Sequence, residues 1–263
     1  MDYEGVVVDL DGTVYRGDQL LDGAREAIAS LRERGLGVAF VTNNPTLGPA
    51  GYVERLAEFG IDAEEREVFS AGTVTARFLA DHHPGEATFV VGSDGLRDQL
   101  RDANVGLTAE PDGAAVVVTS HDYGFDYGTL TEALWALESA DAFYGTDPDR
   151  TYPGGDGRPY PGSGAITRAV AGVADQEPDR VLGKPSEAVV ELLGSRLGPP
   201  ENCLVVGDGL DTDIALAERA GMTSVLVTTG RTDRAAAAAA DVSPDYVVDS
   251  LSDVPALLKR VNV

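Results

Sequence analysis

Cysteine and lysine are almost absent from this chain of 263 residues. It has one cysteine, Cys203, and two lysines, Lys184 and Lys259, against 18 arginines, 27 aspartates and 17 glutamates. A single cysteine excludes a disulfide framework, and its place in the apolar run 203–206 indicates a small buried side chain. No apolar run approaches the ~20 residues of a membrane-spanning helix, and the N-terminus lacks a signal-peptide pattern, so we expect a soluble, cytoplasmic protein.

The formal net charge of −24 is a second imbalance. At ordinary ionic strength it repels nucleic acid, membrane surfaces and anionic ligands, whereas at ~1 M salt the Debye length falls to about 3 Å and the repulsion largely disappears. We therefore expect neither nucleic acid nor membrane as a partner. The acidity favours a halophilic protein over an ordinary acidic protein from a GC-rich genome.

Strand and helix patterns alternate along the whole chain, which predicts an α/β fold with a mainly parallel sheet. The chemical motifs described below all fall outside residues 77–178. We therefore predict a core built from residues 1–76 and 179–263, with a second α/β module inserted at 77–178. Within this insert, residues 147–164 are rich in glycine and proline, which predicts an irregular loop.

Four apolar strands of the predicted core end in polar residues. In an open parallel sheet, ligands bind outside the carboxyl ends of the strands, so these endings are expected to converge on one cleft. Each ending alone has an ordinary structural explanation, such as a turn, a helix start or a solvated acidic loop, and it is their joint occurrence that favours a site. The residues concerned are Asp9 and Asp11, Thr42 and Asn43, Lys184, and Asp208 with Asp213.

The first of these endings carries two carboxylates, Asp9 and Asp11, with Gly12 next to them. Alternate residues of a strand point to the same face, so both side chains should leave the strand end together. Two carboxylates at close range imply a divalent metal, a division of acid and base roles, or both. Lys184 is one of only two lysines in an arginine-rich chain, which favours a chemical need for its ammonium group.

Together the four motifs resemble those of the haloacid dehalogenase superfamily. Four motifs in the insert look like the large cap of its class IIA branch, the NagD-like and 4-nitrophenyl-phosphatase-like hydrolases. They are Gly92-x-x-Gly95-Leu96, Asp122-x-x-Phe125-x-Tyr127, Thr146-Asp147-Pro148-Asp149 and Pro161-Gly162-Ser163-Gly164. The resemblance implies a Rossmann-like core with a C2-type α/β cap. The chain departs from the usual pattern of the branch at three positions, where Pro45, Asp147 and Gly209 replace serine, asparagine and arginine.

The resemblance also implies an activity: Mg²⁺-dependent hydrolysis of a small phosphorylated metabolite through an aspartyl-phosphate. Asp9 would be the nucleophile, Asp11 the general acid and then base, and Lys184 the group that stabilises the transferring charge. The magnesium ion would be held by Asp9, Asp208 and the Asp11 carbonyl, with Asp213 beside them. Phosphoryl oxygens would be bound by Thr42 and by backbone N–H groups near Leu10 and Asn43.

The insert is expected to contact the leaving group, through Asp147, Arg158 and Tyr160. Two other functions stay open: a phosphomutase, and a non-catalytic regulatory protein that binds a phosphorylated metabolite. The protein is expected to be a monomer or a homodimer.

Overall fold

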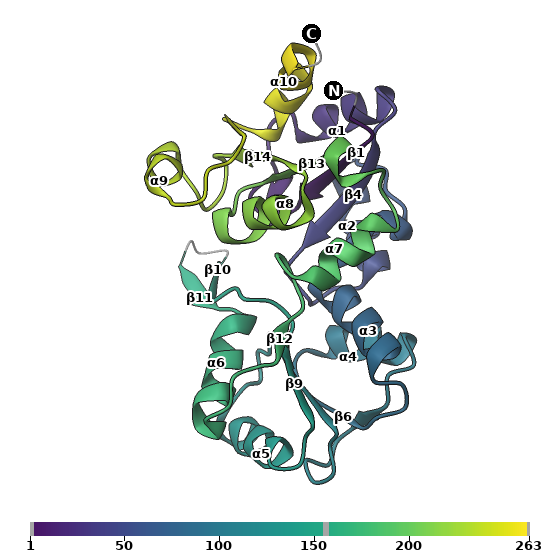
Figure 1. Cartoon of the computed structure of the whole chain (residues 1–263), viewed down its shortest axis with the longest axis vertical. Helices are drawn as coiled ribbons and strands as arrows, with labels where there is room; N and C mark the ends of the chain where they lie inside the picture. Colours follow the sequence, from purple (N-terminus) through teal and green to yellow (C-terminus); the bar gives the residue numbers. More distant parts are fainter. Residues whose placement is uncertain (1–2, 155–157, 262–263) are drawn as a thin grey trace. The chain divides into compact units, whose positions relative to one another are not determined.

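The computed structural model describes residues 3–154 and 158–261 and divides into two compact units (Figure 1). Unit 1 comprises Met1–Thr42, Ala50–Phe69 and Lys184–Val263, and unit 2 comprises Asn43–Pro49 and Ser70–Gly183. Both contain parallel strands flanked by helices, which confirms the α/β prediction. The predicted limits of the inserted module, residues 77 and 178, stay a prediction.

Unit 1 is built on a six-stranded sheet in the order β15-β14-β13-β1-β4-β5. The central strand β1 pairs in parallel with both β13 and β4, and β14 continues the parallel order on the β13 side. These valine-rich runs are buried along most of their length, as is usual for strands covered on both faces. The strands are β1 (Gly5–Asp9), β4 (Gly37–Thr42), β5 (Val68–Ser70), β13 (Cys203–Gly207), β14 (Thr223–Val227) and β15 (Tyr246–Val248).

Helices cover both faces of this sheet. Apolar residues of α1 at helical spacing, Ala24, Ala27, Ile28 and Leu31, join one core with residues of α2 and α10. On the other face α8 contacts β13 and β14, and α7 packs against α8. The helices are α1 (Ala24–Glu33), α2 (Pro49–Glu58), α7 (Glu187–Gly194), α8 (Ala215–Ala220), α9 (Arg234–Ala239) and α10 (Val254–Val261), and a small hairpin is formed by β2 (Tyr15–Arg16) and β3 (Gln19–Leu20).

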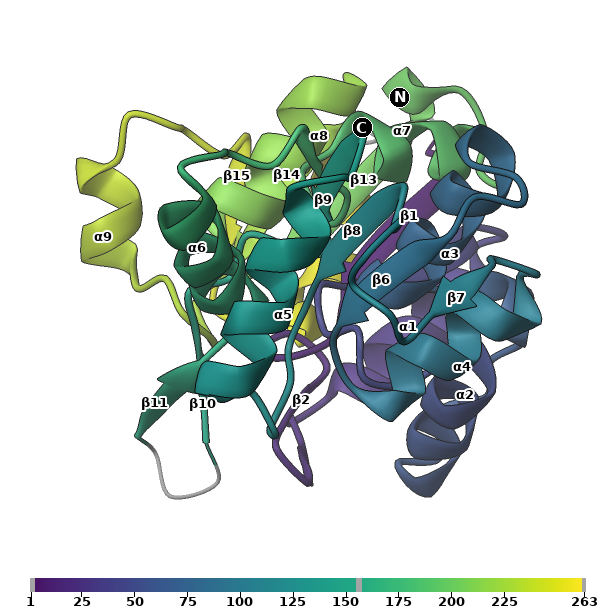
Figure 2. The same ribbon diagram turned by 90° about the horizontal axis from the view of Figure 1, so that it is seen from below.

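Unit 2 has its own five-stranded parallel sheet, in the order β12-β9-β8-β6-β7. Helices α5 and α6 contact each other and the central strands, with which they share an apolar core (Figure 2). Helices α3 and α4 form a second pair. The elements are β6 (Thr88–Val91), β7 (Leu107–Thr108), β8 (Val116–Thr119), β9 (Ala142–Gly145), β12 (Arg180–Val181), α3 (Ala71–His82), α4 (Asp94–Asp102), α5 (Tyr127–Leu137) and α6 (Ser163–Ala174).

The prediction of an irregular loop over residues 147–164 is wrong in part. Two antiparallel strands, β10 (Thr151–Pro153) and β11 (Pro159–Pro161), form a hairpin there, with Tyr152 opposite Tyr160. Proline is tolerated in such a two-stranded ribbon because its missing N–H can face away from the partner strand. Residues 155–157 of the same segment lie outside the described residues.

The helices are short: α3 and α6 have 12 residues each. Across residues 3–154 and 158–261, none is long and apolar enough to cross a membrane.

Candidate active site

The carboxyl ends of three neighbouring strands of unit 1 carry polar residues. Asp9 is the last residue of β1, Thr42 is the last residue of β4, and Asp208 follows β13 directly. Because β1 lies between β4 and β13 and pairs with both in parallel, these ends meet at one edge of the sheet. All three residues are buried, with Asp9 only 6% exposed.

Lys184 lies at the centre of this group. Its Nζ donates to Asp9 Oδ1 and to Asp213 Oδ1, both at 2.6 Å, and to the carbonyl oxygen of Val41 at 3.0 Å. Burial alone would lower the pKa of this ammonium group, but Asp213 and Asp9 outweigh that effect and raise it above its ordinary value. Lys184 is therefore a fixed positive charge between two carboxylates.

The carboxylates of Asp9, Asp208 and Asp213 form a buried cluster, with one oxygen of each within 4.8 Å of the others. Burial raises the pKa of Asp9 well above its ordinary value, with Lys184 opposing and Asp213 and Asp208 adding to the rise. Burial and Asp213 likewise raise the pKa of Asp208 to about 6. Three buried carboxylates beside one ammonium group leave an excess of negative charge, and an all-oxygen set of this kind suits a hard divalent cation.

The segment after β13 is shaped to bring Asp213 back toward the strand end. Residues Leu210–Ile214 form a π-helical turn, a rare geometry that is frequent at functional sites. The N–H of Gly209 donates to Asp213 Oδ2 at 3.0 Å. A Cβ on Gly207 would overlap the Asp213 carboxylate, so this close approach requires glycine.

The turn after β1 holds the second oxygen of Asp9. Thr13, which is fully buried, donates from Oγ1 to Asp9 Oδ2 at 3.1 Å. Both Asp9 oxygens are therefore hydrogen-bonded, to Lys184 and to Thr13. Asp11 lies in this turn with an exposed side chain, and the main-chain oxygen of Leu10 accepts from the N–H groups of Val14 and Thr13. Thr13 was not predicted as a site residue, although it directly follows Asp11 and Gly12 in the sequence.

A further strand end of the unit 1 sheet, after β14, was not predicted as part of the site. The predicted core-sheet strand before Lys184 is instead β12, which belongs to the sheet of unit 2. Thr229 Oγ1 donates to the carbonyl oxygen of Gly12 at 2.6 Å, and the N–H of Arg231 donates to Asp208 Oδ2 at 2.6 Å. The sequence did contain a signal for the ending after β14, because the apolar run of this strand is followed by Thr-Thr-Gly-Arg-Thr. An apolar run that ends in polar residues is the pattern from which the other endings were predicted.

Comparison with known proteins gives matches over nearly the whole chain. A haloacid dehalogenase-like hydrolase family model matches residues 6–106, and a second HAD-hydrolase-like model matches residues 181–254. The sugar-phosphatase AraL of Bacillus subtilis is 35% identical over 257 residues, which cover 97% of this chain and 93% of AraL. This chain belongs to the haloacid dehalogenase-like hydrolases.

Solved structures of this family agree with the assignment. A p-nitrophenyl phosphatase from Archaeoglobus fulgidus superposes with a TM-score of 0.90 at 33% identity, covering 98% of this chain and all of that one. A glycerol phosphate phosphatase from Mycobacterium tuberculosis, solved in complex with magnesium, gives a TM-score of 0.86 at 29% identity over 95% of this chain and 75% of that one. The NagD-like, 4-nitrophenyl-phosphatase-like branch predicted from the motifs is confirmed.

The remaining predicted residues of this hydrolase belong to unit 2. Asn43 is buried, and Asp147 is 2% exposed, with its carboxylate accepting from Thr146 Oγ1 at 3.0 Å and from the N–H of Asp149 at 3.1 Å. Burial and the Asp149 charge raise the pKa of Asp147 to about 7. By contrast, Arg158 and Tyr160 are exposed on the β10–β11 hairpin.

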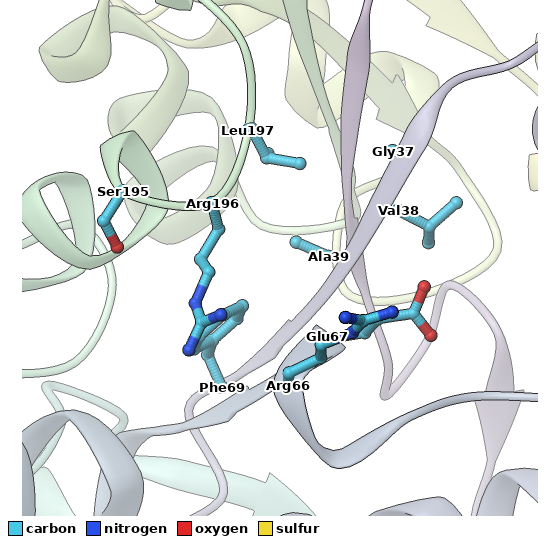
Figure 3. Close-up of a pocket in the computed structure, with 9 residues that line it drawn as sticks. All are labelled: Gly37, Val38, Ala39, Arg66, Glu67, Phe69, Ser195, Arg196 and Leu197. Atoms are coloured by element: carbon cyan, nitrogen blue, oxygen red, sulfur yellow. The ribbon is translucent and has the colours of Figure 1, made fainter.

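A cavity of about 350 Å³ in unit 1 has lining residues that do not include Asp9, Asp208 or Asp213 (Figure 3). It lies along the amino-terminal half of β4, at Gly37, Val38 and Ala39, whereas Thr42 ends the same strand. Arg66 and Arg196 point into this region, and none of the residues predicted for catalysis lines it. We therefore place the candidate active site at the carboxyl ends of the strands and not in this cavity.

Proposed function

We propose that this hydrolase is a Mg²⁺-dependent phosphatase that acts on a small phosphorylated metabolite through a phosphorylated Asp9. The observation that carries the proposal is the contact of Lys184 with both Asp9 and Asp213, at 2.6 Å each, beside the Asp208 carboxylate. A nucleophile held against a fixed cation, next to a set of hard oxygen ligands, is the arrangement that phosphoryl transfer needs.

The donor set fits magnesium, because Asp9, Asp208 and Asp213 offer carboxylate oxygens and no nitrogen or sulfur ligand. Asp9 and Asp208 would hold the ion together with the Asp11 carbonyl, and Asp213 would stay bonded to Lys184. A bound Mg²⁺ would neutralise charge on the phosphoryl oxygens and keep Asp9 ionised despite its burial.

In the first step an Asp9 carboxylate oxygen attacks phosphorus, and the bond between phosphorus and the leaving oxygen breaks. Asp11 gives its proton to that leaving oxygen. Lys184 balances the negative charge that builds up on the phosphoryl oxygens, and Thr42, with backbone N–H groups near Leu10 and Asn43, orients them.

In the second step Asp11, now a carboxylate, takes a proton from water, and the water oxygen attacks phosphorus. The bond from phosphorus to Asp9 breaks, inorganic phosphate is released, and both carboxyl groups return to their starting states. Thr13 and Lys184 hold the two Asp9 oxygens throughout, so the carboxylate turns little between the steps.

We also propose that unit 2 selects the leaving group, through Asp147, Arg158 and Tyr160. Support comes from the hairpin that carries two of them, because Tyr160 lies across from Tyr152, which contacts His121 edge to face. Exposed rings on a loop held by a rigid sheet are suited to contact a substrate. The named activities of the relatives on sugar and glycerol phosphates fit small metabolites of this kind.

Replacing Asp9 by asparagine tests the proposal. Asp9→Asn should abolish Mg²⁺-dependent phosphate release from p-nitrophenyl phosphate, because the amide has nearly the same shape but is a poor nucleophile. Circular dichroism should show the fold unchanged. The control is Asp18→Asn, which alters a fully exposed carboxylate and should keep wild-type turnover.

Wild-type turnover in a folded Asp9→Asn variant would remove Asp9 as nucleophile. Products identify the reaction class: inorganic phosphate indicates a phosphatase, whereas an isomeric monophosphate indicates a phosphomutase. Metabolite binding without turnover in the wild type would indicate a regulatory protein.

A further inference from the structure

Arg231, in the loop after β14, has contacts that the proposed mechanism does not use. Its Nη2 donates to Thr212 Oγ1 at 2.7 Å, while its main-chain N–H donates to Asp208 Oδ2 at 2.6 Å. Its Nε lies 3.8 Å from Asp208 Oδ1, and Nη2 lies 3.9 Å from Asp211 Oδ1. One residue thus contacts three members of the segment 208–213.

Gly209 lies within this segment. The side chains around it, and not its backbone conformation, restrict this position to glycine. Its φ of −104° and ψ of 121° lie in the extended region that any residue adopts. A Cβ at this position, however, would overlap both Arg231 Nη2 and Thr212 Oγ1. The guanidinium group of Arg231 therefore fills the space where a side chain of residue 209 would begin.

We propose that Gly209 and Arg231 work as a pair, in which Arg231 is a positioning residue that holds the segment 208–213 and so fixes Asp208 for the cation. This inference rests on the proposed magnesium site. Gly209 leaves room for the guanidinium, and the hydrogen bond to Thr212 fixes the residue directly before Asp213.

Removing the guanidinium has two opposing effects on a cation. Loss of a positive charge near Asp208 favours cation binding, whereas loss of the Thr212 hydrogen bond releases the segment that presents the carboxylates. The Arg231 side chain is 40% exposed, and its charged contacts with Asp208 and Asp211 are near 4 Å, so solvent screens the charge effect. We expect the loss of positioning to dominate and the cation to bind more weakly.

The experiment measures metal binding directly, in the absence of substrate. Mn²⁺, followed by electron paramagnetic resonance, is titrated into each full-length variant, and Mg²⁺ is then used to displace it. Arg231→Ala and Gly209→Ala should each raise the dissociation constant for Mg²⁺ about tenfold, the size typical when a group that orients a metal ligand is lost.

The double variant gives the sharpest result. Without the guanidinium, Thr212 Oγ1 loses its 2.7 Å partner and can rotate away from its long 3.4 Å contact with Asp213 Oδ2, so a methyl group at residue 209 finds room. Gly209→Ala with Arg231→Ala should therefore weaken Mg²⁺ binding about tenfold, as each single change does, and not about a hundredfold as independent effects would. Unfolding of the metal-free variants in urea verifies that each is folded.

Arg234→Ala is the matched control, because Arg234 lies three residues further on and pairs with Asp249 at 2.7 Å. It removes the same charge but no contact with the segment 208–213, so its Mg²⁺ affinity should equal that of the wild type. Unchanged or tighter Mg²⁺ binding in Arg231→Ala, or additive effects in the double variant, would overturn the pairing. A wild type that binds neither Mn²⁺ nor Mg²⁺ would instead refute the magnesium proposal itself.

Discussion

Lys184 shows at the scale of a residue how the site combines stability and function. A buried ammonium group is costly unless it is paired, and here Asp9, Asp213 and a main-chain carbonyl group surround it. The same contacts place a positive charge beside the proposed nucleophile. Gly209, which departs from the usual arginine of the branch, likewise has one neighbour that fills the space beside it, because Arg231 Nη2 lies where a Cβ of residue 209 would be.

Asp147 gives a prediction that concerns pH. Its pKa is raised from about 3.9 in an unfolded chain to about 7 in the folded protein, mainly by burial. Between these values the folded state keeps a proton that the unfolded state has lost, so this group makes stability fall as pH rises from about 4 to 7 and leaves the penalty in place above 7.

Asp147→Asn removes this penalty. The free energy of unfolding of the variant, measured in urea, should exceed that of the wild type by a growing margin from pH 5 to pH 8, reaching a few kcal/mol. Asp112→Asn, at an exposed position of the same unit, should show no such trend. A margin that does not change with pH would contradict the assigned burial of the Asp147 carboxyl group.

At the scale of elements, the turn after β1 and the loop after β14 press against the segment that follows β13. Gly12 has a φ of +86°, and a Cβ there would overlap the Asp208 carboxylate and crowd the backbone of Gly230. Gly17 also has a positive φ, of +55°, but has nothing within 4 Å of the corresponding position. Both glycines have a positive φ, but only Gly12 has close neighbours.

This difference predicts separate effects for two alanine substitutions. Gly17→Ala should lower the free energy of unfolding by roughly 1–2 kcal/mol, the cost of a side chain in the left-handed region, and Gly12→Ala should lower it by more because its Cβ also overlaps Asp208. Only Gly12→Ala should raise the Mg²⁺ concentration needed for half-maximal phosphatase activity, by about tenfold or more. Equal Mg²⁺ requirements in the two variants would show that the contact with Asp208 is unimportant.

Sequence patterns predicted the individual elements of unit 1 better than the order in which its strands pair. Buried valine runs marked β1, β4 and β13, and the polar residues after them marked the site, because chemistry at a parallel sheet gathers at the carboxyl ends. The contact of Arg231 with Asp208 was missed because hydrophobic periodicity carries no information on strand order, and the order β14-β13-β1 brings this loop to Asp208. The β10–β11 hairpin was missed because three-residue strands that contain proline give no alternating pattern.

At the scale of the whole molecule, the net charge of −24 gives a prediction for stability in salt. Raising KCl from ~0.1 M to ~1 M shortens the Debye length from about 10 Å to about 3 Å, which screens repulsion among surface carboxylates. The melting temperature should therefore rise steeply over this range. Melts in sucrose, which adds no ions, separate the screening of charges from general solvent exclusion. A melting temperature that is flat or falling in KCl would contradict the halophilic interpretation.

The central claim is a two-step reaction through a phosphorylated Asp9, and Asp11→Asn with p-nitrophenyl phosphate tests it most directly. Nitrophenolate is a good leaving group and needs little help from an acid, so the first step should proceed, whereas the second step lacks the base that activates water.

The measurement is a rapid-mixing time course of nitrophenolate release in the presence of Mg²⁺. We predict a burst of one nitrophenolate per active site followed by slow turnover, with the phosphoryl group recovered on the peptide that contains Asp9 after an acid quench. Slow release without a burst, and no phosphorylated peptide, would contradict the account.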